Sequence, residues 1–201
     1  MSTPPPVDID VLRGEIQKTY TDVSEHQEQE FIFPTGRAWA RDLGYPEGLL
    51  GRIPEETVES FAGVANHFTL GDIDTGATVL DLGCGAGTDL LIAAQMVGPG
   101  GRAIGIDITS AMVERARQSA AEMGLDNVEV HEGLIEQLPL PDESVDVVIS
   151  NGVIDLVPDK DAVFAEIKRV LKPGGRLQIA DVVIHRTVSE EAKRDIDLWT
   201  G

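Results

Sequence analysis

The stretch Asp81-Leu82-Gly83-Cys84-Gly85-Ala86-Gly87-Thr88 decides how this chain folds. An apolar run over residues 77–82 leads into it, and an apolar helical pattern over residues 89–97 follows it. A strand, a glycine turn and a helix in this order form a ligand site at the carboxyl end of a parallel strand. Glycine suits the turn because the backbone must bend sharply and a ligand must approach it without meeting side chains.

Strands and helices alternate along the chain from residue 77 onward. The predicted strands are residues 77–82, 102–107, 128–131, 145–150 and 176–184. The predicted helices are residues 89–97, 110–123, 160–171 and 189–199. This alternation predicts an α/β domain over residues 76–201, with a parallel sheet and helices on both of its faces.

Residues 1–75 are predicted to form a helical extension. Apolar residues at three- and four-residue spacings predict a helix over residues 8–24, and a second short helix is expected over residues 55–61. Residues 1–6, with three consecutive prolines, are expected to be disordered. The segment Phe31-Ile32-Phe33 is interpreted as a small edge strand or a loop anchor.

Composition excludes several classes of protein. The 201 residues carry a formal charge of −19, which disfavours nucleic acid and anionic membranes because both need a basic surface. This charge fits either salt adaptation or an ordinary acidic, solvated surface. No apolar run reaches the ~20 residues of a membrane span, and no signal-peptide pattern is present, so a cytoplasmic location is expected. Cys84 is the only cysteine and the four histidines lack paired spacing, so no metal site is predicted.

The acid that ends the second predicted strand narrows the choice of ligand. Asp107 comes twenty residues after Gly87, where a carboxylate can accept hydrogen bonds from both hydroxyls of a ribose. The alternative is an exposed aspartate that caps the following helix. Thr88 replaces the last glycine of a dinucleotide fingerprint, and Asp81 would repel a pyrophosphate. An acid at position 81 instead favours S-adenosylmethionine, which carries an ammonium and a sulfonium.

Four motifs in order resemble the class I S-adenosylmethionine-dependent methyltransferases. They are Val79–Gly87, Gly105-Ile106-Asp107, Leu138-Pro139-Leu140-Pro141 and Val170-Leu171-Lys172-Pro173-Gly174-Gly175. The resemblance implies a Rossmann-like three-layer sandwich with sheet order 3-2-1-4-5, an N-terminal segment that forms a lid, and methyl transfer to a small-molecule acceptor by direct displacement. The cofactor-binding residues that it implies, with Asp81 as the acid near the ammonium, are Asp81, Gly83, Cys84, Gly85, Gly87, Asp107, Ile108, Met112, Gly133, Leu134, Ile135, Ser150 and Asn151.

By the same resemblance, different residues of this set contact different parts of the cofactor. The three glycines line the methionine part, Asp107 holds the ribose, and Ile108 lies near the adenine, whose edge residues 134–136 pass. Many relatives have an acid at the position of Leu134, so adenine recognition is expected to use backbone groups. Ser150 and Asn151 are expected to face the site of methyl transfer.

Within this superfamily the chain resembles arsenite methyltransferases and their homologues. The resemblance rests on residues 85–89, 97–102, 148–156 and 198–201. Those enzymes hold trivalent arsenic with cysteine thiolates, as a soft metalloid requires. Two of the cysteine positions correspond to Gly152 and to about Val64, and a third follows Thr200-Gly201. The sequence therefore matches the scaffold of that family but lacks its arsenic site.

The acceptor side is less defined. The candidate catalytic residues are Tyr20, His67 and Asn151, with Tyr20 expected to approach the sulfonium and His67 to border the acceptor pocket as a general base. Each also has a purely structural interpretation, as has Phe61, a further candidate. Two alternatives to a small-molecule methyltransferase stay open: an arsenite methyltransferase proper, and a cofactor-binding module without catalysis.

The C-terminal part of the chain leaves one edge of the sheet open. The superfamily usually adds an antiparallel hairpin after the fifth strand, and no such hairpin is predicted here. An exposed edge strand invites pairing. We therefore expect either that the chain is a truncated form or that this edge is covered, by a homodimer or by residues 31–33.

Overall fold

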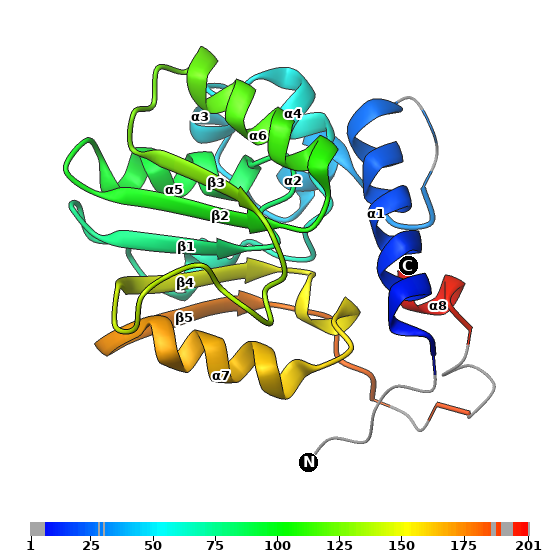
Figure 1. Cartoon of the computed structure of the whole chain (residues 1–201). Coiled ribbons are helices and arrows are strands. Elements are labelled where there is room, and N and C mark those ends of the chain that lie inside the picture. The colour runs from blue at the N-terminus through cyan, green and yellow to red at the C-terminus, as the bar shows by residue number, and fades with distance from the viewer. Residues whose placement is uncertain (1–6, 28, 30, 186–187, 190–194, 201) are drawn as a thin grey trace.

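The computed structural model describes residues 7–27, 29, 31–185, 188–189 and 195–200. The expected disorder of residues 1–6 lies outside this part of the chain. A five-stranded parallel sheet has the order β3-β2-β1-β4-β5, which confirms the predicted topology (Figure 1). Its strands are β1 (Thr78–Leu82), β2 (Arg102–Asp107), β3 (Val128–Glu132), β4 (Val145–Asn151) and β5 (Leu171–Ala180).

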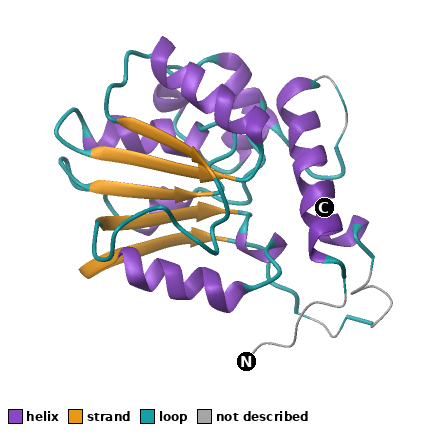
Figure 2. Cartoon of the chain, in the orientation of Figure 1, coloured by secondary structure: helices purple, strands orange, loops and turns teal. Residues whose placement is uncertain are grey.

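Helices cover both faces of this sheet, and the connections follow the predicted alternation (Figure 2). The α-helices of the sheet-forming part are α5 (Thr88–Val97), α6 (Ser110–Glu122), α7 (Lys160–Val170) and α8 (Asp197–Thr200). Those that precede it are α1 (Ile9–Glu25), α2 (Gly36–Asp42), α3 (Glu47–Leu50) and α4 (Glu55–Glu59). Two short 3₁₀ helices complete the described elements, namely η1 (His67–Leu70) and η2 (Ile154–Leu156). None of the described helices is long and apolar enough to cross a membrane.

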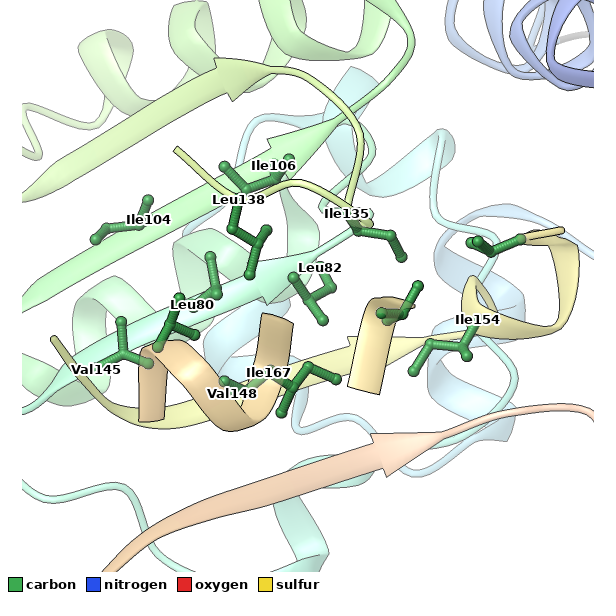
Figure 3. Packing of buried hydrophobic residues seen from close by; sticks show 13 residues of the cluster. Leu80, Leu82, Ile104, Ile106, Ile135, Leu138, Val145, Val148, Ile154 and Ile167 are labelled. Carbon is green, nitrogen blue, oxygen red and sulfur yellow. The ribbon is translucent and has the colours of Figure 1, made fainter. Parts of the chain in front are cut away.

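The two faces of β1 belong to different parts of the core. Successive side chains of a strand point to opposite faces. Leu80 and Leu82 pack on the face that α7 covers through Ile167 (Figure 3). Val79 points the other way and packs against Ala93 of α5. Burial on both faces explains why the central strands read as continuous apolar runs.

The helix α1 lies beside the carboxyl ends of the strands (Figure 1). Asp8 caps it by accepting hydrogen bonds from two backbone amides of its first turn. At its other end Arg115 of α6 donates to the Ser24 carbonyl at 2.9 Å. Tyr20 of α1 stacks on Phe33 with 5.9 Å between ring centroids. These contacts hold α1 over the edge of the sheet at which parallel sheets bind ligands.

The segment of residues 31–33 forms no strand. Phe31 and Phe33 stack on each other at 5.9 Å and pack beside Tyr20, Val23 and Met112. The segment is therefore a loop anchor under α1. The prediction that it covers the edge of the fifth strand is wrong, because its rings are held by α1 and α6.

The fifth strand and the last helix differ from their predicted bounds. β5 begins at Leu171, which pairs with Val145, and it ends at Ala180 instead of residue 184. It ends there because the Asp181 carboxylate accepts the backbone amide of Ile154 at 2.9 Å, which turns the chain away from β4. The last helix covers only Asp197–Thr200, not residues 189–199: Ser189, Asp195 and Ile196 are not helical, and residues 190–194 lie outside the described part.

Candidate cofactor and acceptor site

One cavity opens at the carboxyl ends of β1, β2, β3 and β4, under α1. It holds about 1010 Å³ of space between protein atoms, including the part open to solvent. Eleven of the thirteen residues predicted to bind the cofactor line it, and Gly87 and Ser150 do not. The other lining residues are Arg13, Ile16, Tyr20, Ser60, Phe61, Ala62, Gly63, Ala86, Thr88, Asp89, Thr109, Glu136, Gly152, Val153, Leu156, Val157 and Pro158.

The glycine turn after β1 forms the floor of the cavity. Gly83 has φ +65° and Gly85 has φ +52°, a region that favours glycine. A Cβ at position 83 would lie 2.4 Å from a methyl carbon of Val153, so no larger residue fits without a shift. Gly87 has a different role, because it is the N-cap of α5 and packs against Ala116 of α6.

Asp107 ends β2 and joins the glycine turn to the start of α6. Its Oδ2 accepts the Gly85 amide at 2.8 Å, and its Oδ1 accepts the Thr109 amide at 2.8 Å. The carboxyl is 8% exposed, and this burial raises its pKa. Each carboxylate oxygen can accept a second hydrogen bond. Asp107 therefore shapes the turn, and its side chain lines the cavity. The alternative of an exposed aspartate that caps the following helix is wrong, because Asp107 is buried and Thr109 is the N-cap of α6.

Asp81 brings a buried carboxyl to the cavity, and one of its oxygens has no partner. Its side chain is 2% exposed, and its Oδ2 has no hydrogen-bond partner. Burial, followed by the nearby carboxylates of Asp89 and Asp107, raises the pKa of Asp81. An unpaired buried carboxylate is costly. A cation in the cavity would remove this cost.

The side of the cavity below β2 and β3 is lined by backbone and apolar groups. Ile108, Met112 and residues 133–135 line it as predicted. Gln17 of α1 donates to the Ile108 carbonyl at 2.9 Å. Arg13 of α1 pairs with Glu136 at 3.0 Å. These two contacts attach α1 to the same loops that the cofactor is predicted to touch.

Sequence reasoning missed a polar network at the β4 side. Asp89, in the first turn of α5, accepts the Tyr45 hydroxyl at 2.7 Å and the Asn151 Nδ2 at 3.0 Å. The Asn151 Oδ1 in turn accepts the Val64 amide at 2.8 Å, and its Nδ2 donates to the Ala65 carbonyl at 2.9 Å. An acid directly after the glycine turn was the one available signal for Asp89. Nothing near Tyr45 in the sequence pointed to this site.

The three catalytic candidates have different surroundings. Tyr20 and Asn151 line the cavity. Burial and the carboxylates of Asp155 and Asp107 raise the pKa of Tyr20, so its phenol is not ionised at neutral pH. His67 does not border the pocket: it is 1% exposed, and its Nε2 lies 3.2 Å from Asp89 Oδ2 outside hydrogen-bonding geometry. The prediction of His67 at the pocket edge is wrong, because η1 turns the ring into the core beside Phe68.

Two other residues have structural surroundings. Ser150, predicted to face the site of methyl transfer, is fully buried, and its hydroxyl donates to the Leu82 carbonyl at 3.3 Å. That prediction is wrong because the Ser150 hydroxyl is directed to the backbone of the neighbouring strand β1. Cys84 lines the cavity but is only 5% exposed, and burial raises the pKa of its thiol. A thiol in this state is a poor nucleophile and a poor metal ligand.

A family model described as a methyltransferase domain matches residues 73–200. This match covers more than half of the chain, and it includes the glycine turn, Asp107 and Asn151. The chain is a class I S-adenosylmethionine-dependent methyltransferase domain. The predicted family and cofactor are thereby confirmed.

Known methyltransferases resemble the chain over most of its length. An arsenite methyltransferase of Halobacterium salinarum is 47% identical over 139 residues, which are 69% of this chain and 36% of that protein. A nocamycin O-methyltransferase of Saccharothrix syringae is 42% identical over 136 residues, or 67% of this chain and 49% of that protein. An arsenic(III) S-adenosylmethionine methyltransferase of Chlamydomonas reinhardtii superposes with a TM-score of 0.65 and 37% identity, over 73% of this chain and 51% of that structure. The chain therefore spans about half the length of these relatives or less.

The methyltransferase domain lacks thiolates where the resemblance to arsenite methyltransferases expects them. A Cβ at Gly152 would lie 3.1 Å from the Val64 Cγ1, so the two expected cysteine positions are neighbours in space. A glycine and a valine occupy them. Among the described residues, no group of three histidine, cysteine or acidic side chains could hold a metal ion.

Proposed function

We propose that this methyltransferase domain transfers a methyl group from S-adenosylmethionine to a small-molecule acceptor by direct displacement. The observation that carries the proposal is the buried, unpartnered Asp81 Oδ2 in a cavity whose floor is the glycine turn. A ligand with an ammonium and a sulfonium supplies a positive charge for this unpartnered oxygen. When bound, S-adenosylmethionine provides a methyl group activated by the positive sulfur.

The residues of the cavity fit the cofactor in a definite direction. Asp107 at the end of β2 would accept the ribose hydroxyls, and residues 133–136 after β3 would pass the adenine. Gly83 and Gly85 let the methionine part approach the backbone, with Asp81 near its ammonium. The methyl group then lies toward the end of β4, at Asn151.

The remaining task of the protein is to orient the acceptor. In-line displacement needs no covalent intermediate with the enzyme, and orientation in a dry site can supply roughly 7–11 kcal/mol. Under this proposal Tyr20 excludes water, and Asn151 positions the loop of residues 63–65. The division into residues 1–75 and 76–201 stays a prediction, with α1 in the role of a lid.

A small acceptor is supported by the setting of the site. α1 and its contacts to Glu136 and Ile108 roof the cavity, which disfavours a polymer. The charge of −19 disfavours nucleic acid. A relative of similar identity is named for O-methylation of nocamycin, a small molecule.

Arsenite is the second candidate acceptor, because an arsenite methyltransferase is 47% identical over the matched residues. The cysteine content of this sequence disfavours arsenite as the acceptor. Cys84 is the only cysteine, and it is buried in the glycine turn.

Three measurements test these alternatives. Calorimetry with S-adenosylmethionine is expected to show binding, and absence of binding would reject the proposed function. Incubation with methyl-labelled cofactor and a metabolite extract is expected to label small molecules, whereas no label in any fraction would favour a binding module without catalysis. Incubation with arsenite and glutathione is expected to give no methylated arsenic; its formation would establish the second candidate.

A further inference from the structure

The order of the strands distinguishes the nucleoside end of the cavity from the end that the acceptor must enter. The ribose-binding role proposed for Asp107 places the nucleoside at β2 and β3, on one side of β1. The reactive methyl group then lies on the other side, toward β4. The acceptor must therefore enter the part of the cavity that lies beyond the end of β4.

We define this acceptor end by two segments. The first is residues 61–63, which precede β1. The second is formed by residues 152–153 and 156–158, which follow β4. They meet where Gly63 packs against the Asn151 side chain and Val64 against Gly152. The lining residues that they contribute are Phe61, Ala62, Gly63, Gly152, Val153, Leu156, Val157 and Pro158.

No residue of these two segments that lines the cavity carries a charge or a polar side chain. Phe61 provides a flat apolar wall, held by an edge contact with Tyr45 at 5.1 Å and 65°. The adjoining side chain of Asn151 has its amide engaged by protein groups on both its oxygen and its nitrogen. The acceptor end thus offers apolar contact and few free hydrogen-bonding groups.

Two cations lie near the cavity, and neither lines the acceptor end. Arg13 is the one basic residue among the described lining residues, and it pairs with Glu136 on the β3 side. Lys160 follows the lining segment but donates to the carbonyls of Asp155 and Val157, at 2.9 Å each. No described cation therefore lines the acceptor end.

Three carboxyl groups also surround the acceptor end. Asp89 contacts Asn151 at 3.0 Å. Asp155 precedes Leu156 in η2, and the Asp181 carboxylate accepts the Asp155 amide at 3.3 Å. Burial and the Asp181 carboxyl raise the pKa of Asp155 to about 7, and the nearby Lys160 ammonium opposes this rise.

We propose that the methyl acceptor is an uncharged, predominantly apolar molecule, and that carboxylate and phosphate compounds are excluded. This inference rests on the proposed function, because it uses the direction in which the cofactor would lie. The cofactor's sulfonium would lie beside the atom that receives the methyl group. A carboxylate or phosphate elsewhere on the acceptor would be desolvated against apolar side chains, with negative neighbours and no protein cation lining the acceptor end. Burial of an unpaired charge in such surroundings is strongly unfavourable.

A matched pair of probes tests this inference. Binding of 2-naphthol and of 6-hydroxy-2-naphthoate, which differ by one carboxylate, is measured by calorimetry on the protein with and without S-adenosylhomocysteine. We expect 2-naphthol to bind at least tenfold more tightly in both conditions. Equal or tighter binding of the naphthoate would overturn the inference, and so would no measurable binding of 2-naphthol.

A lysine placed at the acceptor end gives a second test. In Leu156→Lys we expect the preference for 2-naphthol to fall at least tenfold, while the uncharged control Leu156→Met keeps it. Thermal unfolding checks that both variants fold. An unchanged preference in Leu156→Lys would show that the probes bind elsewhere and would reject the inference. Failure of S-adenosylhomocysteine to bind would instead reject the proposed function. The ratio of the two probe affinities, measured without S-adenosylhomocysteine, would still test whether the acceptor end disfavours anions.

Discussion

Replacing Asp107 tests the predicted direction of the cofactor. The Asp107 carboxylate accepts the Gly85 and Thr109 amides at 2.8 Å each, and the residue lines the cavity. A hydrogen bond to a charged group contributes about 1.5–3 kcal/mol. At about 1.4 kcal/mol per tenfold change, Asp107→Ala should weaken binding of S-adenosylhomocysteine by about one to two decades.

The ligand can be varied to separate ribose contact from damage to the turn. Calorimetry would compare S-adenosylhomocysteine with its 2′-deoxy analogue. In the native protein the analogue should bind more weakly, and in Asp107→Ala the two ligands should bind nearly equally. Asp126→Ala removes the same charge from an exposed position and serves as the control.

Two results would refute the reasoning. The first is an unchanged affinity for S-adenosylhomocysteine in Asp107→Ala. The second is an equal loss for both ligands, which would mean that Asp107 acts only by holding the Gly85 amide.

Four further predictions follow from the site and the surface. Asp89→Asn should lower the free energy of unfolding by about 1–3 kcal/mol, because the Tyr45 hydroxyl loses its charged acceptor; an unchanged urea midpoint would contradict this. The pKa of Asp81 is raised, and a bound cation favours the ionised form of this carboxyl, so affinity for S-adenosylmethionine should fall as pH decreases through that pKa. Calorimetry across pH should show a flatter dependence of affinity on pH in Asp81→Asn. Equal slopes in the two proteins would exclude Asp81 as the group that titrates. Gly83→Ala should cost about 1–3 kcal/mol of stability through overpacking against Val153, and Val153→Ala in the same chain should restore part of it; no recovery in thermal melts would place the strain in the backbone alone. The charge of −19 should make the melting temperature rise with added KCl, since the Debye length falls from about 10 Å at 0.1 M to about 3 Å at 1 M. A rise that continues at higher salt indicates salt adaptation, and a rise that levels off indicates an ordinary acidic surface. A fall in the melting temperature would contradict repulsion between the acidic side chains.

The predicted homodimer stays a prediction. Leu177 of β5, the edge strand, is 44% exposed, and Val183 beyond it is 70% exposed. Light scattering of the purified chain would measure the mass directly.

Much of the fold was readable from local patterns. The apolar run before Gly83 and the glycines after it specify a strand, a turn and a helix whatever the rest of the chain does. Asp107 could be placed in the site from sequence, because parallel strands bring their carboxyl ends to one edge. The motif resemblance then supplied the order of the strands, which the structure reproduces.

Other features depended on contacts between distant parts of the chain. Asp89 and Tyr45 are 44 residues apart, and Asn151 is 62 residues from Asp89, so no local pattern could join them. The end of β5 was misjudged for the same reason. Its apolar residues continue to Ile184, but the Asp181 carboxylate binds the start of η2 and diverts the chain.

The sequence by itself therefore determined the half of the site that we propose binds the cofactor, and the tertiary structure decided the half proposed to face the acceptor. The first half is built by residues that adjoin one turn and the ends of neighbouring strands, so their spacing carries the information. The second half forms where residues 61–65 meet the end of β4, so only the folded chain brings its uncharged lining residues together. Only the folded chain shows that His67 turns inward beside Asp89 while Phe61 and Leu156 line the acceptor end.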